Sequence, residues 1–132
     1  PNIAMLALIE KVSEKLPETV LAHNTVEQYK NDLRFMIEGP IALDVALSET
    51  AAIAKKINSN IAGKTDIFIG PNITATNFIS KMLLSIGNSK GGGVIIGAKI
   101  PIILLSRSDS METKLNSIAL GLSIYHNQFK TR

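Results

Sequence analysis

Short apolar runs alternate along the chain with segments of helical period. The runs at residues 3–9, 33–37 and 66–70 are short and are followed by polar or turn residues, which favours buried strands. Segments 17–30, 48–56 and 75–86 predict helices. Pro17 suits a first helical turn, Ser48 can cap the second helix, and Gly87 is placed to end the third.

The C-terminal third predicts a different arrangement. Residues 93–96 and 101–105 read as two strands separated by only four residues. A parallel crossover needs about a dozen residues or more, so this pair is predicted to be antiparallel or one bent strand. The last helix is expected at residues 110–125, where Asp109 and Glu112 fit a capping box.

The predicted order of elements is β-α-β-α-β-α-β-β-α. This alternation indicates an α/β fold, a three-layer α/β/α arrangement with a mostly parallel sheet that contains one antiparallel strand. Because no linker interrupts the pattern, we expect residues 1–132 to form a single α/β domain. Glu38-Gly39-Pro40 is predicted to be a loop that ends the second strand.

Regular apolar stripes on the predicted helices identify the expected core. Ala51, Ala52 and Ile53 are expected to be buried on the second helix, and the strand at residues 66–70 is expected to be buried as well. The third helix carries Ala75, Phe78, Ile79, Met82, Leu83 and Ile86, and the last helix carries Met111, Leu115, Ile118, Ala119, Leu122 and Tyr125.

Composition narrows the class of protein. Hydrophobic residues make up 45% of the 132 residues and charged residues 19%, which is typical of a globular chain. The formal net charge is +3, with basic residues scattered and aromatics at only 5%. This argues against a nucleic-acid partner and suits a small polyanionic ligand.

Several kinds of chemistry are disfavoured by what the chain lacks. No cysteine is present, which excludes disulfides and thiolate nucleophiles, and His23 and His126 show no ligand spacing, so no metal is expected. No apolar run approaches the ~20 residues that cross a bilayer, so no membrane partner is expected. Because residue 1 is Pro and an apolar run starts at Ile3, we expect the chain to be a piece of something longer.

Ser106 and Arg107 are the leading candidates for a functional site. Ligands of open α/β sheets bind outside the carboxyl ends of the strands, and residues 38–40, 70–72, 97–99 and 106–109 follow predicted strands. The last of these leads into a helix. An arginine fork matches phosphate, and a serine hydroxyl can donate or accept. Spacing alone leaves open that Arg107 is a surface ion-pair residue and Ser106 a turn residue.

Other candidates have simpler structural explanations. Residues 91–93 are three glycines that could cradle phosphate, but a strand is predicted after them, so a flexible turn is favoured. Asp44 is either a general base or a helix-entry residue, and Glu112 either an acid–base group or a capping residue. Lys81 is either solvated or ligand-binding, and Asn77 binds either a ligand or the preceding loop.

Three stretches together resemble a known family. EGPIALDVALSETAA, AGKTDIFIGPNITATNFISK and GGVIIGAKIPIILLSRSDSMETKLNSIAL are similar, in order and spacing, to the C-terminal half of the phosphate acetyl/butyryltransferases. The closing segment is more like the butyryl branch, because acetyl members typically carry Gly where this chain has Ser108. The family's fold resembles that of the isocitrate and isopropylmalate dehydrogenases, with two α/β domains and the site in the cleft.

The resemblance implies an acyltransferase that exchanges an acyl group between coenzyme A and inorganic phosphate. It implies no bound cofactor, a coenzyme A thioester as substrate, and a bacterial, cytoplasmic homodimer. The site residues carried over are the catalytic Ser106, Arg107 and Glu112 and the substrate-binding Glu38, Pro71, Asn72, Asn77 and Lys81.

This chain departs from the family pattern at three positions. Thr76 replaces a Gly and Ser80 a Tyr near the conserved lysine. Thr113 stands where acetyl members carry an acid, with Glu112 beside it, which leaves the acid–base assignment open.

The resemblance also leaves the role of this chain open. The first possibility is the C-terminal part of a two-domain acyltransferase, with little or no activity alone. The second is a non-catalytic dimerisation or ligand-binding module of the same fold. A dehydrogenase of this fold is a third, weaker possibility, because no dinucleotide or metal–carboxylate constellation is present.

Overall fold

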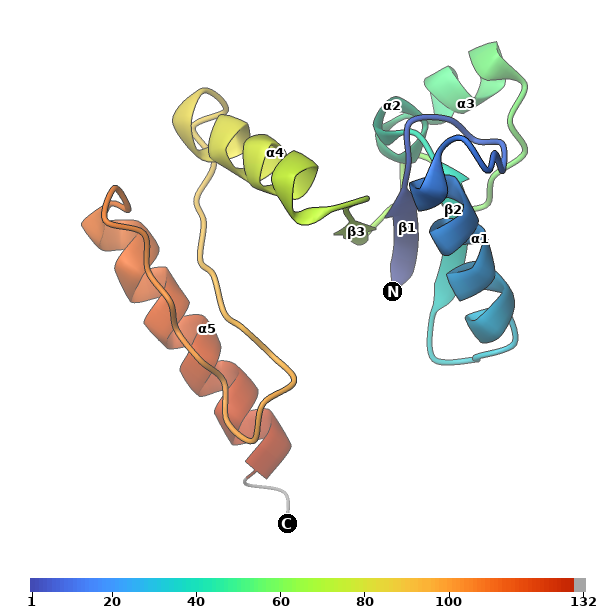
Figure 1. The fold of residues 1–132 in the computed structure, drawn as a ribbon. Coiled ribbons are helices and arrows are strands. Elements are labelled where there is room, and N and C mark those ends of the chain that lie inside the picture. Colours follow the sequence, from blue (N-terminus) through green and yellow to red (C-terminus); the bar gives the residue numbers. More distant parts are fainter. Residues whose placement is uncertain (130–132) are drawn as a thin grey trace. The chain divides into compact units, whose positions relative to one another are not determined.

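The computed structural model describes residues 1–129. Its internal contacts divide the chain into two compact units, and the boundary in the sequence falls between Phe78 and Ile79. Each unit is described by itself, and a single domain over residues 1–132 stays a prediction. The first unit holds β1 (Asn2–Leu6), α1 (Pro17–Tyr29), β2 (Met36–Ile41), α2 (Leu43–Leu47), α3 (Glu49–Lys55) and β3 (Ile67–Ile69) (Figure 1). Helix α4 (Ile73–Ser85) crosses the boundary, and α5 (Met111–Phe129) lies in the second unit.

The sheet of the first unit has the order β2-β1-β3, and both of its pairings are parallel. Ile3 of β1 lies opposite Ile37 on one side and Ile67 on the other. A mostly parallel sheet with helices is therefore confirmed, together with the predicted helices at residues 17–30 and 48–56 to within two residues.

The antiparallel strand that the sequence predicts is not confirmed. Ile95 and Ile102 form one antiparallel bridge, with N–H···O distances of 2.8 and 3.0 Å in its two hydrogen bonds, and the described residues around them form no longer strand. Nearby backbone groups bind α5 side chains instead: the Gly93 amide donates to Ser117 Oγ and the Gly91 carbonyl accepts from Asn116. The three-layer arrangement and the dehydrogenase-like fold likewise stay predictions.

Strand β2 continues through Gly39 and Pro40, so the predicted loop at residues 38–40 is wrong. Glu38 lies opposite Ala4, and Ile41 lies opposite Leu6, so β2 carries an extra residue and bulges there. Proline is tolerated because β2 is an edge strand and a bulge leaves backbone groups unpaired. A Cβ on Gly39 would lie only 2.5 Å from Met5 Cβ, so the bulge requires glycine.

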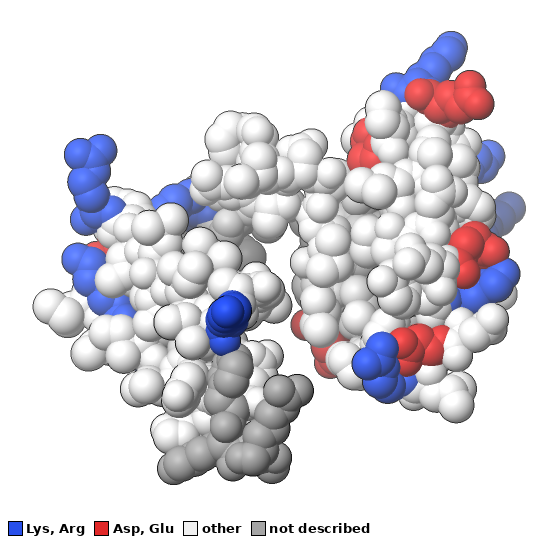
Figure 2. All heavy atoms as spheres, turned by 60° about the horizontal axis from the view of Figure 1, so that its bottom comes forward, with Lys and Arg blue, Asp and Glu red and all other residues white. Residues whose placement is uncertain are grey.

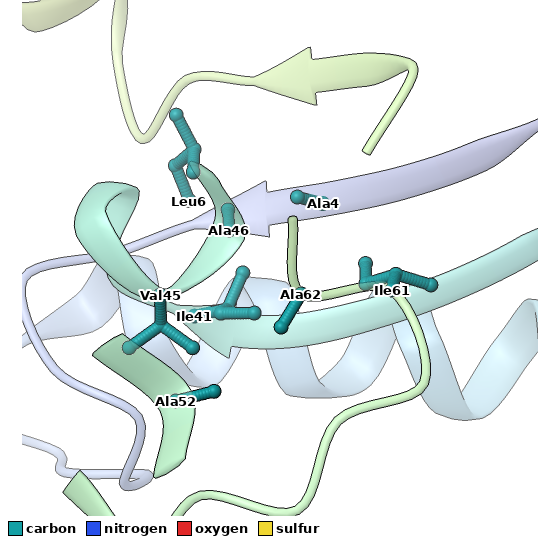
Figure 3. Close-up of a cluster of buried hydrophobic side chains, with 8 residues drawn as sticks. All are labelled: Ala4, Leu6, Ile41, Val45, Ala46, Ala52, Ile61 and Ala62. Atoms are coloured by element: carbon teal, nitrogen blue, oxygen red, sulfur yellow. The ribbon is translucent and has the colours of Figure 1, made fainter. Parts of the chain in front are cut away.

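The core of the first unit is built mostly from small side chains. Ala46 of α2 and Ala52 of α3 belong to one buried cluster with Ala4 and Ile41 of the strands (Figure 3). Their short side chains let the helices approach the strands closely. Helix α2 was not predicted, and it is separated from α3 by Ser48, whose Oγ caps α3 through the Ala51 amide. The complete cluster is Ala4, Leu6, Ile41, Val45, Ala46, Ala52, Ile61 and Ala62.

The burial predicted from apolar stripes is partly wrong within the described residues. Ala52 is buried, but Ile53 is 71% exposed, and β3 is exposed along its length. On α5 the buried positions are the small residues Ser117 and Gly121, whereas the stripe that includes Met111 and Leu115 is exposed. Small residues occupy the buried positions of α5 because they let residues 91–103 approach the helix backbone closely. These residues run beside α5 in Figure 1.

Helix α4 shows the same difference from expectation. It spans Ile73–Ser85, close to the predicted 75–86, but none of its residues is buried. Phe78 is 67% and Met82 59% exposed. Across residues 1–129, no helix combines the length and apolarity that a membrane span needs.

Candidate functional site

Ser106 and Arg107 lie in a tight turn directly before α5. The Ser106 amide donates to Asp109 Oδ2 at 2.7 Å, and the Asp109 amide donates to the Ser106 carbonyl at 3.1 Å. The hydroxyls of Ser106 and Ser108 share a hydrogen bond of 3.0 Å across the turn. The turn therefore holds Ser106 by its backbone and its side chain.

The predicted capping box at the start of α5 is wrong. The Asp109 carboxylate closes the preceding turn, so Ser110 takes the capping role, and its Oγ accepts from the Thr113 amide at 3.1 Å. Glu112, the other half of the expected box, pairs with Lys90 instead. A carboxylate already engaged on one side of a turn is poorly placed to cap the helix on the other side.

Arg107 is exposed, and within residues 1–129 it forms no ion pair. The surface ion-pair alternative therefore finds no support in the described part of the chain. Ser106 is half-buried in the turn. An arginine with no carboxylate partner has its planar guanidinium fork available for an anion.

A cavity of about 540 Å³ lies beside this turn in the second unit. Its walls come from the C-terminal part of α4, the following loop at residues 88–91 and the turn at residues 108–110 with the start of α5. Lys81 and Glu112, both predicted from the sequence, line it together. Ser106 and Arg107 adjoin it through Ser108 and Asp109. The volume falls in the range of small-molecule sites.

Lys90 is a lining residue that the sequence did not single out. Its Nζ lies 2.8 Å from Glu112 Oε1, and its hydrogen bond and ion pair with that carboxylate raise the pKa of the Lys90 ammonium. Glu112, in the first turn of α5, is therefore paired with Lys90 and does not cap the helix. The one signal in the sequence that points to Lys90 is its position directly before the three glycines at residues 91–93.

The three glycines pack the chain closely against helices. A Cβ on Gly92 would lie 3.0 Å from the backbone carbon of Asn116, and a Cβ on Gly91 would lie 2.5 Å from Leu84 Cδ2. Asn116 Nδ2 donates to the Gly91 carbonyl at 3.2 Å. Close approach explains these glycines without a phosphate loop, and the strand expected after them does not form in the described residues.

Glu38 holds a loop in the first unit. Its carboxylate accepts hydrogen bonds from Ser59 Oγ at 2.6 Å, from the Asn60 amide at 2.9 Å and from Asn60 Nδ2 at 3.2 Å. A second cavity, of about 420 Å³, lies there and is also lined by His23 and Lys56. It lies where β1 and β2 end, the edge at which α/β sheets bind ligands.

Pro71, Asn72 and Asn77 belong to the entry of α4. Asn72 Oδ1 accepts from the Ala75 amide at 2.9 Å, and the Asn72 carbonyl accepts from the Thr76 hydroxyl at 2.7 Å. Asn72 is therefore a helix cap, a structural role that is independent of any ligand. Pro71 is half-buried and Asn77 is exposed.

The predicted site residues divide between the two units. Lys81, Ser106, Arg107 and Glu112 lie in the second unit. Glu38, Pro71, Asn72 and Asn77 lie in the first.

Asp44 and the metal-ligating residue types offer no competing centre in the described part. Asp44 Oδ1 binds Lys55 Nζ at 2.9 Å, and this hydrogen bond lowers the pKa of Asp44, while Lys55 also binds Glu10. An ion-paired, exposed carboxylate fits a surface role better than a general base. Residues 1–129 contain no group of three or more His, Asp or Glu side chains that could hold a metal ion.

The fold is similar to that of two solved enzymes. A branched-chain phosphotransacylase from Enterococcus faecalis matches with a TM-score of 0.86 and 36% identity, over 96% of this chain and 46% of that chain. The EutD phosphotransacetylase from Staphylococcus aureus matches with a TM-score of 0.71 and 26% identity, over 94% of this chain and 39% of that chain. The α/β fold is therefore that of the phosphotransacylases.

Residues 1–122 match the family described as phosphate acetyl/butaryl transferase, and the chain belongs to this family. Phosphate butyryltransferase from Clostridium acetobutylicum is 39% identical over 97% of this chain and 43% of its own length. Phosphate acetyltransferase from Thermotoga maritima is 42% identical over 92% of this chain and 42% of its own length. The chain thus spans about two-fifths of the length of these relatives.

Proposed function

We propose that this chain is part of an acyltransferase that exchanges an acyl group between coenzyme A and inorganic phosphate. The observation that carries the proposal is a family match over residues 1–122, a range that includes the ordered turn bearing Ser106 and Arg107. The unpaired Arg107 and the lysines of the adjoining cavity supply the charge that two anionic substrates require.

The reaction is an acyl transfer that balances without a covalent enzyme intermediate. A phosphate oxygen attacks the carbonyl carbon of the thioester, forming a C–O bond and a tetrahedral intermediate. The C–S bond then breaks, and the sulfur leaves with the electron pair as coenzyme A thiolate. The products are acyl phosphate and, after protonation, the free thiol. Negative charge develops first on the carbonyl oxygen and then on sulfur, so positioned cations and donors accelerate both steps.

Each candidate residue has a role in this scheme. Arg107 offsets charge on the attacking phosphate or the leaving thiolate, and the Ser106 hydroxyl donates to the carbonyl oxygen or the sulfur. Glu112 is the proposed acceptor of the proton from phosphate, a role that requires its carboxylate to leave the ion pair with Lys90. Lys81 adds charge at the cavity wall. Glu38, Pro71, Asn72 and Asn77 stay proposed substrate-binding residues. Glu38 would act by holding the loop at residues 59–60, and Asn72 by fixing the start of α4.

We also propose that the chain supplies only one part of the site. It covers about two-fifths of each relative, so the 132 residues alone are expected to have little turnover. The preferred substrate is butyryl-coenzyme A rather than acetyl-coenzyme A, on the basis of Ser108, whose hydroxyl binds that of Ser106. The complete protein is expected to be a cytoplasmic homodimer.

Phosphate-dependent thiol release tests this function. The chain would be joined to the portion of the Clostridium acetobutylicum phosphate butyryltransferase that it does not match, and release of free coenzyme A would be followed with a thiol reagent. We expect release from butyryl- and acetyl-coenzyme A only when phosphate is present. The isolated chain, assayed beside it, is expected to be at least about a hundredfold slower.

Two outcomes would contradict the proposal. Absence of release with both thioesters, from a folded chimaera, would favour a non-catalytic module. Release that is independent of phosphate would indicate hydrolysis rather than transfer. Full activity of the isolated chain would refute only the claim that it is one part of a larger site.

A further inference from the structure

Charge is distributed unevenly between the two units. From Ile79 onward the sequence carries seven Lys and Arg residues against two Asp and Glu, a net charge of +5. The first unit carries seven against nine, a net charge of −2. On the face shown in Figure 2, acidic side chains are scattered over one unit and sparse on the other. The basic unit is the one that contains the 540 Å³ cavity.

Two ammonium groups line that cavity, from different segments. Lys81 comes from α4 and Lys90 from the loop that follows it. Hydroxyl-bearing residues from the end of α4, the loop at residues 88–91 and the turn at residues 108–110 line much of the remaining wall, including Ser85, Ser89, Ser108 and Ser110. Two carboxylates also line the cavity: Asp109 accepts from the Ser106 amide, and Glu112 pairs with Lys90. With Glu112 displaced, the two ammonium groups and the hydroxyls are complementary to phosphate oxygens.

The backbone that carries Lys90 is well anchored. Gly91 next to it contacts Leu84 of α4 and receives a hydrogen bond from Asn116 of α5. The Lys90 side chain is 80% exposed, and among the described residues its ammonium group is paired only with Glu112, whose side chain is 58% exposed. Exposed ion pairs contribute little to stability, so a multiply charged anion can replace Glu112 as the partner of Lys90.

We propose that Lys90, together with Lys81, binds the phosphate groups of the coenzyme A nucleotide in this cavity, and that Lys90 releases Glu112 when it does so. The inference rests on the proposed function, because coenzyme A enters the argument as its substrate. Once released, the Glu112 carboxylate can accept the proton that the attacking phosphate loses. Binding of the nucleotide thereby prepares the base for the chemical step.

Equilibrium binding to the 132-residue chain tests the proposal without any turnover. Calorimetric titrations would use coenzyme A, dephospho-coenzyme A and inorganic phosphate as probes. We expect Lys90→Gln to weaken coenzyme A binding about tenfold, with a smaller effect at high salt. Lys99→Gln is the matched control: it removes the same charge from the same unit at an exposed lysine outside the cavity, and it should change affinity less than twofold.

Glu112→Gln tests whether the nucleotide phosphates replace Glu112 as the partner of Lys90, or whether the ion pair only holds the cavity together. If Glu112 competes for Lys90, its removal should tighten coenzyme A binding by up to about fivefold, opposite in sign to Lys90→Gln. Weaker binding in both variants would mean that the ion pair only holds the cavity together, and would overturn the proposal. Circular dichroism would confirm that each variant keeps its helices.

The probes separate the two sources of phosphate. Sensitivity to Lys90→Gln that appears with coenzyme A but not with inorganic phosphate supports the proposal. Sensitivity with inorganic phosphate and none with coenzyme A would assign Lys90 to the second substrate and overturn it. No binding of coenzyme A by the chain would also overturn it. Loss of turnover in the chimaera, with Lys90-dependent binding retained, would refute the proposed function alone.

Discussion

The Ser106 amide and the Asp109 carboxylate form a hydrogen bond of 2.7 Å that closes the turn carrying Arg107. The Asp109 amide returns a hydrogen bond to the Ser106 carbonyl, so the turn is tied at both ends. Ser110 therefore caps α5, and residues 108–110 of the same turn line the cavity. The orientation of the proposed catalytic pair thus depends on a carboxylate that is not itself proposed to touch substrate.

Loss of the Asp109 carboxylate should lower turnover without unfolding α5. In Asp109→Ala the turn loses its side-chain acceptor, worth about 1 kcal/mol or more, and we expect kcat in the chimaera to fall about tenfold. Asp109→Asn keeps an acceptor oxygen and should retain most of the activity. Equal loss in both variants, with helix content unchanged by circular dichroism, would point to a direct role for the charge instead.

Gly92 should tolerate substitution less well than its neighbour Gly93. A methyl group at Gly92 would meet the backbone of Asn116 at 3.0 Å, whereas nothing lies within 4 Å of one at Gly93. We expect Gly92→Ala to lower the free energy of unfolding by about 1–3 kcal/mol and Gly93→Ala to leave it within about 0.5 kcal/mol. Urea denaturation measures both. Equal destabilisation would contradict the packing that we describe for residues 91–93.

Glu38 should matter for the loop at residues 59–60. Glu38→Ala removes the acceptor of three hydrogen bonds and is expected to cost about 1–3 kcal/mol of stability. Glu38→Gln keeps one oxygen acceptor and should cost less. Hydrogen exchange at the Asn60 amide should quicken in the Ala variant. Unchanged exchange and an unchanged urea midpoint would leave substrate binding as the only role for this residue.

The apolar period and the residues that start or end helices predict the helices well, because local chemistry defines them. Pro17, Ser48 and the apolar period of residues 75–86 mark helices that form within two residues of expectation. The sheet was harder to predict, because Gly-Pro at residues 39–40 ends a strand in most contexts but is accommodated here by a bulge at an edge. Helix α2 was missed because it is only five residues long.

The site was only partly predictable for a related reason. Ser106 and Arg107 are predicted from their place before a helix and from the family resemblance, and Lys81 and Glu112 from the resemblance. The structure places Lys81 and Glu112 beside one cavity, and the roles of all four stay predictions. The partners of Asp109, Glu112 and Glu38 were not predictable, because each is chosen by contacts that depend on tertiary structure. Small-residue packing on α5 likewise overrode the larger apolar stripe.

The role of Arg107 in phosphate-dependent thiol release is the central claim, and one measurement tests it most directly. In the chimaera, with butyryl-coenzyme A and phosphate, Arg107→Ala should lower kcat/KM by about a hundredfold or more, as expected for removal of a charge that stabilises a transition state. Arg107→Lys should recover part of that loss, and the thermal midpoint should not change, because Arg107 is exposed and unpaired in the described chain. Activity equal to that of the unmodified chimaera in Arg107→Ala would contradict the account.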